Sequence, residues 1–281
     1  MGAKTFTVKR HHLIIESMII SMPKLAERLN MKMTLDDVEE FFMKVVDDTI
    51  AYREKNNIVV TDENGKQVPG LNRGELAAQA FVFFLAGFET SSTTMGFLLY
   101  ELALNPEIQE ALRSEILTAL EGNDGQLTYE MLSEIPLLDK VIMETLRKYP
   151  ILHQLDRQAL NDYPISGTKH VIEKGIRVII PVDAIHYDPE IYPDPEKFDP
   201  ERFTPEEIQK RHPMAWLPFG EGPRNCIGLR FGKMQVKIGL ITLLKDYSFS
   251  VSDKTVIPIK INLEQFLLQS VGGIYLKVKK L

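Results

Sequence analysis

The sequence predicts a mainly α-helical protein with a small β part, and three observations lead to this fold class. Apolar residues recur at helical spacing over most of the chain. One helical candidate is much longer than the others, from about Arg73 to Leu104, where Asn105-Pro106 should end it. After Pro150 the pattern changes to short β-rich runs separated by turns, so the strands should form only a small sheet.

The first helix with a clear start signal follows Thr34. Thr34 and Asp37 form a variant of the capping box, and apolar residues then recur at helical spacing as far as about Lys55. The stretch 56–72 is polar and contains two turn-like pairs, Asn-Gly and Pro-Gly. We therefore expect a helix that is followed by an exposed loop.

The long helix from Arg73 would measure about 48 Å if it were unbroken. Its first half, with the sequence AAQAFVFFLAGF, is apolar on all sides, which is typical of a helix that runs through a protein core. The polar run from Glu89 to Thr94 interrupts the apolar segment after about a dozen residues. This pattern favours a core helix over a membrane span.

The remaining elements have proline, glycine or turn boundaries. Asn105 should cap the helix that starts at Pro106. We expect helices over 106–120, 137–148 and from the only cysteine to 244, strands at QLDRQ and around turns at 166–167 and 174–175, a meander of turns over 181–213, and closing strands over 247–251 and 273–278.

The only cysteine, Cys226, lies in the glycine-rich stretch PFGEGPRNCIG, residues 218–228. The glycines can take positive φ or let a flat ligand approach the main chain, and Pro223 stiffens the loop. A helix should begin just after Cys226, and the partial positive charge of a helix N-terminus favours a thiolate. These features indicate a metal ligand; the alternative is a lone cysteine that packs as a small buried hydrophobic side chain.

A single cysteine cannot form a Cys₄ iron–sulfur site or an internal disulfide, and the sequence has no CxxC or HExxH motif. The loop closely resembles the haem-binding signature F-x-x-G-x-R-x-C-x-G of the cytochrome P-450 family. The fixed positions of that signature are matched by Phe219, Gly222, Arg224, Cys226 and Gly228. The resemblance implies the cytochrome P-450 fold and the cofactor haem b (iron protoporphyrin IX), with Cys226 as the axial ligand of the iron.

The resemblance also implies which other residues contact the cofactor and the substrate. Two cations would meet the haem propionates, Arg224 in the loop and Arg157 in the QLDRQ strand. The other loop residues expected at the haem are Phe219, Gly220 and Gly228. The family lines its substrate pocket at positions that correspond to Leu152, His153 and the turn at 267–270.

The long helix contains the segment Ala86-Gly87-Phe88-Glu89-Thr90-Ser91, which resembles the oxygen-side segment of the same family. A glycine inside a helix costs about 1 kcal/mol relative to alanine, and a hydroxyl that bonds to the i−4 carbonyl can bend the helix. By resemblance, Ala86 and Gly87 face the haem, Thr90 hydrogen-bonds dioxygen, and Glu89 relays protons. The alternative is that Glu89 and Thr90 lie at an ordinary buried bend.

Glu144 and Arg147 are three residues apart on one helix, a spacing that lets them form an ion pair. This ExxR pattern alone is very weak evidence. The family combines it with a downstream PERF motif, which this chain carries as Pro200 to Phe203. The resemblance implies a buried, mutually hydrogen-bonded triad of Glu144, Arg147 and Arg202 with a structural role under the haem loop.

The composition limits the partners of this chain. It has 281 residues, 44% of them hydrophobic, and a formal net charge of −6, which argues against a nucleic-acid partner.

No GxGxxG fingerprint for flavin or nicotinamide is present, so electrons must come from a partner. By resemblance this partner is an NADPH-dependent flavoprotein reductase, and cytochrome b5 is a second candidate. Six cations are close in sequence to the cysteine loop: Lys210, Arg211, Arg224, Arg230, Lys233 and Lys237. They could form a docking face for the reductase, or they could be an ordinary solvated surface.

The resemblance is strongest to the microsomal eukaryotic class, and within it to the insect xenobiotic-metabolising branch. It implies a location on the cytoplasmic side of the endoplasmic reticulum membrane. An apolar patch over 13–20 is too short to span a bilayer, and it could lie on the membrane surface or form a core helix. Because full-length members are much longer, we expect residues 1–281 to be the C-terminal portion of a single cytochrome P-450 domain, without the N-terminal anchor and first helices.

The function expected from these residues is that of a haem-thiolate monooxygenase, which inserts one atom of O₂ into a lipophilic organic substrate. Two alternatives stay open. One is an incomplete fragment that carries the motifs but binds little haem. The other is a haem-thiolate isomerase or dehydratase that uses peroxides, although such relatives tend to lose the acid and alcohol pair that Glu89 and Thr90 provide.

Overall fold

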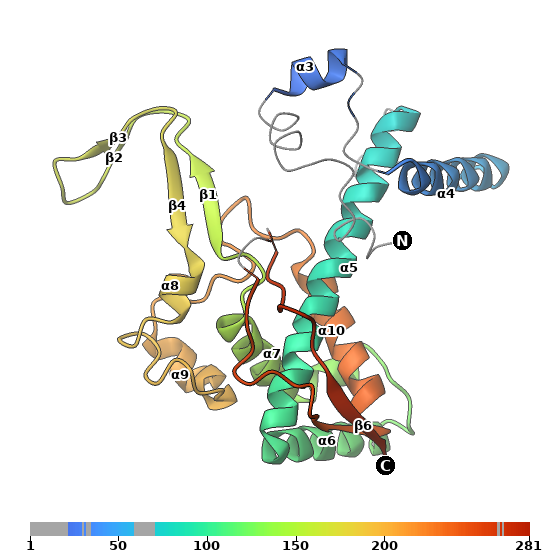
Figure 1. The fold of residues 1–281 in the computed structure, drawn as a ribbon, viewed down its shortest axis with the longest axis vertical. Coiled ribbons are helices and arrows are strands. Elements are labelled where there is room, and N and C mark those ends of the chain that lie inside the picture. The colour runs from blue at the N-terminus through green and yellow to red at the C-terminus, as the bar shows by residue number, and fades with distance from the viewer. Residues whose placement is uncertain (1–21, 30, 32–34, 59–70, 263–264, 266) are drawn as a thin grey trace. The chain divides into compact units, whose positions relative to one another are not determined.

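The computed structural model describes residues 22–29, 31, 35–58, 71–262, 265 and 267–281. They divide into two compact units, Met1–Glu89 and Thr90–Leu281, and one long helix runs from the first unit into the second (Figure 1). The apolar patch at 13–20, the capping residue Thr34 and most of the loop expected over 56–72 lie outside the described residues.

The structure confirms a mainly α fold with few strands. The helices and 3₁₀ turns are α3 (Pro23–Arg28), α4 (Asp36–Lys55), α5 (Arg73–Leu104), α6 (Pro106–Glu121), η1 (Glu130–Ser133), α7 (Pro136–Lys148), α8 (Val182–His186), η2 (Pro200–Phe203), α9 (Pro205–Lys210), η3 (Pro213–Ala215) and α10 (Leu229–Leu244). The strands are β1 (Gln154–Gln158), β2 (Tyr163–Pro164), β3 (Val171–Ile172), β4 (Arg177–Pro181), β5 (Tyr247–Val251) and β6 (Leu276–Lys280).

In the first unit, α4 packs an aromatic side chain against the first half of α5. The ring of Phe42 meets the rings of Phe81 and Phe84 edge-on, each at a centroid distance of 5.1 Å. Helix α4 ends at Lys55 as predicted, but its N-cap residue is Leu35, whose side chain makes no capping hydrogen bond. The N-cap therefore falls one residue after the Thr34 that the capping-box pattern indicated.

The first half of α5 is exposed, so the prediction of a helix buried on all sides is wrong for this chain. Val82, Phe83, Phe84 and Phe88 keep 56%, 57%, 39% and 43% of their surface accessible. A helix that is apolar all round needs neighbours on every side to be buried. Within this unit, the described ring contacts that α5 makes with another element are those with α4. By length and composition α5 is also apolar enough to cross a membrane, with 22% of its most apolar window buried.

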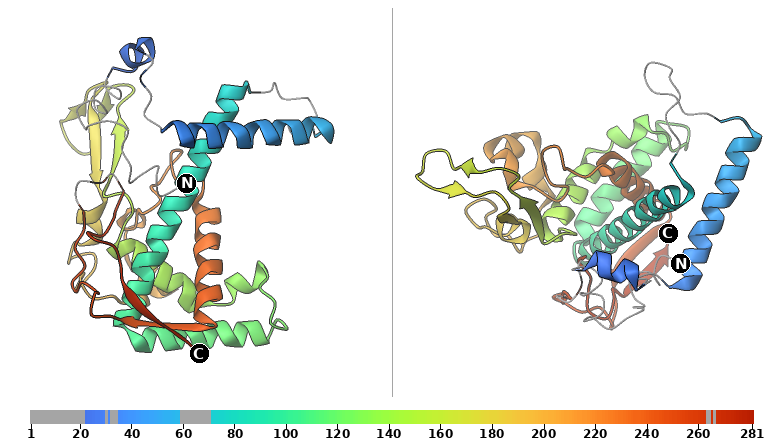
Figure 2. Two further views of the ribbon diagram at one scale, coloured as in Figure 1. Left: turned by 45° about the vertical axis from the view of Figure 1, so that its right-hand side comes forward. Right: turned by 90° about the horizontal axis from the view of Figure 1, so that it is seen from above.

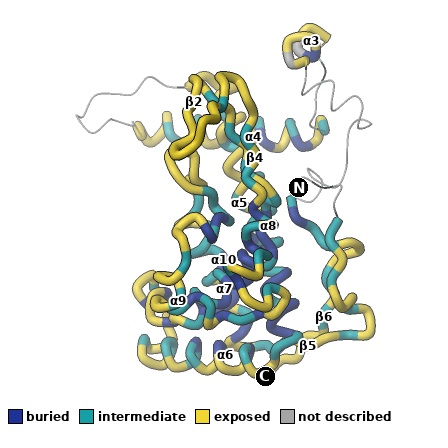
Figure 3. Tube along the Cα trace, turned by 90° about the vertical axis from the view of Figure 1, so that its left-hand side faces the viewer, coloured by how far each residue is buried: buried dark blue, intermediate teal, exposed yellow. Residues whose placement is uncertain are grey.

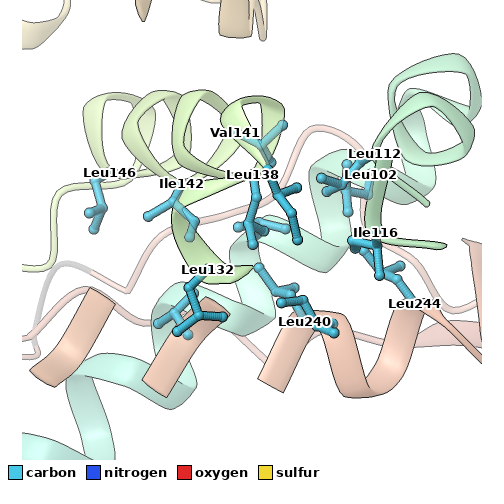
Figure 4. Packing of buried hydrophobic residues seen from close by; sticks show 14 of the residues in the cluster. Leu102, Leu112, Ile116, Leu132, Leu138, Val141, Ile142, Leu146, Leu240 and Leu244 are labelled. Carbon is cyan, nitrogen blue, oxygen red and sulfur yellow. The ribbon is translucent and has the colours of Figure 1, made fainter. Parts of the chain in front are cut away.

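The second unit has a hydrophobic core between the second half of α5 and helices α6, α7 and α10 (Figures 2 and 4). Leu102, Leu112, Leu138 and Leu240, one from each helix, are completely buried. Helix α10 lies close to α5, since a Cβ added at Gly239 would come within 2.6 Å of the Met95 sulfur. The buried stretches of α7 and α10 stand out from the exposed β2–β3 hairpin in Figure 3.

The strands form three separate antiparallel pairs, β1 with β4, β2 with β3, and β5 with β6. The two predicted turns have the positive φ that glycine permits, 76° at Gly167 and 89° at Gly175. The last strand begins three residues later than predicted, at Leu276, because its register is set by pairing with β5.

Two further sequence predictions need correction. The segment 181–213 contains the short helices α8, η2, α9 and η3 in addition to turns. Asn105 occupies the N-cap position of α6, but its amide donates backwards to the carbonyl oxygen of Glu101 at 2.8 Å and makes no capping bond. Local propensity indicates a helix boundary at Asn105 and irregular structure over 181–213. Tertiary contacts then determine the conformation at both places.

Candidate functional site

The cysteine loop, residues 218–228, folds back on itself between η3 and α10. The Cys226 amide donates to the Phe219 carbonyl oxygen at 2.8 Å, and the Gly220 amide donates to the Leu217 carbonyl oxygen at 3.0 Å. Gly220 and Gly222 have positive φ of 66° and 83°, which other residues rarely adopt. The predicted need for glycine in this loop is therefore confirmed at these two positions.

The Cys226 side chain is exposed and not disulfide-bonded. Helix α10 begins three residues later, with Gly228 as its N-cap, so the prediction of a helix just after the cysteine is confirmed. The exposure excludes the alternative in which the cysteine is a small buried core residue.

Arg157 approaches the cysteine loop from strand β1. A Cβ placed on Gly220 would lie 3.8 Å from the Arg157 Nη2 atom and 3.6 Å from a methyl group of Leu155. Arg224 is exposed within the loop itself. In the part of the chain that the structure describes, neither guanidinium forms an ion pair with a carboxylate. Both cations are therefore available to bind carboxylate groups of a ligand.

A buried ion pair lies near the cysteine loop, on helix α7. Arg147 Nε and Nη2 donate to the two oxygens of Glu144 at 2.7 and 2.9 Å, and both side chains are completely buried. Burial raises the pKa of the Glu144 carboxyl, although hydrogen bonds from Arg147 and from the Asp199 amide act in the opposite direction. Burial also opposes the charge on Arg147, but the bonds to Glu144 outweigh it and raise the pKa of the guanidinium.

Arg202 joins this pair, but not in the way the sequence predicted. Its Nε atom lies 3.5 Å from Glu144 Oε1 and has no hydrogen-bond partner, while its Nη2 donates to the Asp194 carbonyl oxygen at 2.9 Å. Glu144 Oε1 instead accepts from the Asp199 amide at 2.9 Å. The three residues come together, but the expected mutual hydrogen bonding is wrong for Arg202. The Asp199 amide takes its place, and no side-chain motif could have indicated a backbone donor.

His186, which sequence reasoning missed, contacts both the ion pair and the loop. Its Nδ1 lies 3.1 Å from the Arg147 carbonyl oxygen, and its Nε2 accepts from the Leu217 amide at 2.9 Å. Arg147 Nη1 donates in return to the His186 carbonyl oxygen at 2.9 Å. A single histidine in a turn-rich segment has no spacing signal, so only the tertiary structure reveals its position.

The segment predicted to face oxygen lies in one continuous helix, α5. Ala86, Gly87 and Glu89 belong to the first unit, and Thr90 is the first residue of the second. The Thr94 hydroxyl donates to the Thr90 carbonyl oxygen at 2.9 Å, which is the i−4 bond expected to bend a helix here. The hydroxyl of the neighbouring Ser91 donates to Gln235 of α10 at 3.0 Å. The second unit thus ties the Thr90 end of α5 to the helix that follows Cys226.

Two of the six cations predicted to form a docking face lie on helix α10 and make contacts within the protein. Lys237 forms an ion pair with Asp139 at 2.7 Å and is only 11% exposed. Lys233 lies 5.3 Å above the ring of Trp216, and burial lowers the pKa of its ammonium group. These contacts correct the prediction of a basic face at these two positions, because side chains held by the protein interior cannot also meet a partner.

Two more of the six cations are held by their own segment. Lys210 pairs with Glu207, and the Arg211 guanidinium lies 4.9 Å above the ring of Tyr192. Arg224 and Arg230 are exposed. Within the described residues, the exposed cations that remain of the predicted docking face are these two arginines beside Cys226 and Lys210, whose side chain is 65% exposed although it pairs with Glu207.

His153 and Leu268, two residues predicted to line a substrate pocket, both line a cavity of about 690 Å³ in the second unit. His153 Nδ1 contacts Asp183 Oδ2 at 2.6 Å, and burial raises the pKa of the Asp183 carboxyl. Neither Cys226 nor Thr90 lines this cavity. It is thus separate from the cysteine loop, and the role of His153 at a substrate stays a prediction.

A cysteine thiolate is one of the protein ligands that hold haem iron, and this mainly α fold presents one exposed thiol in a glycine loop. The family model described as Cytochrome P450 matches residues 4–277. The chain is 50% identical over 289 residues to the protein named "Probable cytochrome P450 6a13" of Drosophila melanogaster, and 50% identical over 298 residues to "Cytochrome P450 6a2" of the same organism. Each alignment covers 100% of this chain and 59% of the relative. The chain belongs to the cytochrome P450 family.

The residues present at the loop fit haem, the cofactor that this family implies. A soft sulfur ligand is exposed at Cys226. The guanidiniums of Arg157 and Arg224, which form no ion pair among the described residues, match the charge of two propionates. Nothing lies within 4 Å of the position that a side chain would take at Gly222. The loop therefore offers a ligand atom, counter-charges and open space in one place.

Proposed function

We propose that the chain carries the haem-thiolate site of a monooxygenase that inserts one oxygen atom from O₂ into a lipophilic organic substrate. The single observation that best supports this is the exposed Cys226 thiol in a loop that Arg157 also contacts. Bound haem would supply the redox chemistry that activates oxygen. The chain spans 59% of the length of the curated relatives. The monooxygenase activity is therefore proposed for a site that the longer relatives carry together with further residues.

In this proposal, the site residues have different roles. Cys226 would hold the haem iron through its thiolate, and Arg157 and Arg224 would orient the cofactor by binding its carboxylates. Glu89 and Thr90 follow one another in α5, and a carboxyl and a hydroxyl at this spacing can pass protons to oxygen. The Glu144–Arg147 pair is structural, because it is completely buried and cannot touch a substrate.

Electrons come, in this proposal, from an NADPH-dependent flavoprotein reductase, with cytochrome b5 as a second donor. Arg224 and Arg230 are the exposed cations beside Cys226 that an acidic partner surface would meet. The similarity to insect cytochromes P450 supports a location on the cytoplasmic side of the endoplasmic reticulum membrane and a role with xenobiotic substrates.

The test of this function is oxygen incorporation by the chain reconstituted with haem, a flavoprotein reductase and NADPH under ¹⁸O₂. We expect one ¹⁸O atom in the product of a lipophilic substrate. Turnover with a peroxide substrate and no requirement for O₂ would instead support an isomerase or dehydratase. Failure of the wild-type chain to retain haem would show that it carries the motifs without the activity.

Thr90→Ala tests the proton-delivery role within the same assay. Losing the hydroxyl should uncouple the reaction, so that NADPH consumption continues while product formation falls roughly tenfold or more. Ser92→Ala, two residues away on the same helix, is the matched control and should stay coupled. Unchanged coupling in Thr90→Ala would remove this residue from the mechanism.

A further inference from the structure

Both ring nitrogens of His186, a fully buried side chain at the end of α8, are in hydrogen-bond contact with the backbone of other elements. Nδ1 lies 3.1 Å from the Arg147 carbonyl oxygen at the end of α7, and Nε2 lies 2.9 Å from the Leu217 amide nitrogen. Leu217 immediately precedes the cysteine loop. One imidazole ring therefore bridges the ion-pair helix and the start of the loop.

The two partners determine the tautomer of the ring. An amide N–H can only donate, so Nε2 must be the acceptor for Leu217, and a carbonyl oxygen can only accept, so Nδ1 must carry the hydrogen. The neutral Nδ1–H form is the one form that makes both bonds. Burial lowers the pKa of His186 to about 4; the hydrogen bond to the Arg147 carbonyl oxygen opposes this shift, and the Arg147 charge adds to it, so the ring stays neutral at physiological pH.

The bridge continues into the loop through the backbone. The Leu217 carbonyl oxygen accepts from the Gly220 amide at 3.0 Å, and two residues further on the Phe219 carbonyl oxygen accepts from the Cys226 amide at 2.8 Å. On the other side, Arg147 Nη1 donates to the carbonyl oxygen of His186 itself at 2.9 Å. Hydrogen bonds connect the Glu144–Arg147 pair to His186 and His186 to Leu217. The short backbone segment from Leu217 to Phe219 and the Phe219–Cys226 bond continue this connection to Cys226.

We propose that His186 is a positioning residue that fixes Leu217, the residue just before the cysteine loop, to helix α7 and thereby sets the place of the Cys226 sulfur. The consequence for haem binding rests on the proposed function, whereas the consequence for the loop backbone does not. If the histidine only filled space, the loss of either ring-nitrogen hydrogen bond would affect the loop to the same extent. A positioning histidine acts on the loop through Nε2 alone.

Two conservative substitutions separate the two nitrogens. The amide of His186→Gln reaches the position of Nε2, where its oxygen can accept from Leu217, but it leaves the Arg147 carbonyl oxygen without its donor. The shorter amide of His186→Asn reaches the position of Nδ1 and can donate to Arg147, but it leaves the Leu217 amide without an acceptor. His186→Phe fills the site and makes neither bond.

The experiment is amide hydrogen exchange on the full 281-residue chain without added haem, read at Leu217, Gly220 and Cys226. We expect His186→Asn and His186→Phe to exchange roughly tenfold faster at these amides, which is the effect of losing one hydrogen bond, and His186→Gln to stay within about twofold of the wild type. Equal acceleration in the Asn and Gln variants, or none in the Asn variant, would overturn the proposal.

Haem titration of the same proteins separates this inference from the proposed function. Weaker haem binding in His186→Asn than in His186→Gln supports both. Tight binding by all variants together with unchanged loop exchange overturns the positioning role and leaves the function intact. Faster loop exchange in His186→Asn and His186→Phe but not in His186→Gln, when even the wild type binds no haem, supports the positioning role and overturns the haem site.

Discussion

The cysteine loop and the polar network beside it are built in opposite ways. The loop carries its reactive group in the open, since Cys226 is exposed and its neighbour Ile227 is 87% exposed. In the network, Glu144, Arg147 and His186 are completely buried. In the account proposed above, buried groups that do not touch a ligand set the position of the exposed Cys226 thiol. The predictions below test this division of work.

Removing one charge from the buried pair should have the largest effect. Arg147→Met leaves the Glu144 carboxylate buried without its main partner, which should lower the free energy of unfolding by roughly 3–5 kcal/mol. Urea denaturation followed by circular dichroism measures the loss. The double variant Glu144→Leu with Arg147→Met should recover part of it, because no charge is then buried alone. A loss below about 1 kcal/mol in the single variant would contradict a supporting role for the pair.

Acid should weaken the network next, through His186. Its pKa in the folded protein, about 4, lies below the ordinary value of 6.5, so the unfolded state binds more protons between these two values. Its contribution is complete above pH 6.5 and is lost as the pH falls to about 4, by about 3 kcal/mol in total. The measurement is the free energy of unfolding of the wild type and of His186→Gln across this range. Parallel curves would show that His186 does not titrate as described.

The loop cations should affect cofactor affinity more than stability. Arg157→Gln and Arg224→Gln should each weaken haem binding roughly tenfold, because each removes a charge-assisted hydrogen bond to a propionate. Unfolding free energies should change by less than about 0.5 kcal/mol, since neither arginine has an ion-pair partner among the described residues. Arg230→Gln, an exposed neighbour just beyond the loop, is the control and should bind haem normally.

The smallest effect on stability is expected at the loop itself. Cys226→Ala removes an exposed sulfur that supports no other described side chain, so the free energy of unfolding should stay within about 0.5 kcal/mol of the wild type. Thermal unfolding without added haem measures it. A large loss would mean that the thiol is a structural residue, and the contrast between loop and network would then be wrong.

Much of the helical framework could be predicted from the sequence. Helices α5, α6, α7 and α10 have strong apolar periodicity and proline or glycine boundaries, and their ends fall within three residues of the prediction. The cysteine loop could also be predicted, because its glycines, its proline and its single cysteine are local features. These elements share one property: neighbouring residues determine their conformation.

What the sequence could not predict depends on contacts between distant residues. The apolar first half of α5 gave no sign that Phe83 would be exposed, because burial depends on which elements pack against the helix. Lys237 resembled a surface cation until its distance to Asp139, 98 residues away, was known. His186 and the Asp199 amide act through backbone groups, which have no sequence signature.

The most direct test of the central claim is the ferrous–CO difference spectrum of the haem-reconstituted chain, measured for the wild type and for Cys226→Ala. We predict a red-shifted Soret band typical of thiolate ligation in the wild type, and its complete loss in Cys226→Ala with helicity unchanged by circular dichroism. A thiolate-type band that persists in Cys226→Ala would contradict the assignment of this cysteine as the iron ligand. A wild type that binds haem and folds normally but never gives the band would contradict it equally.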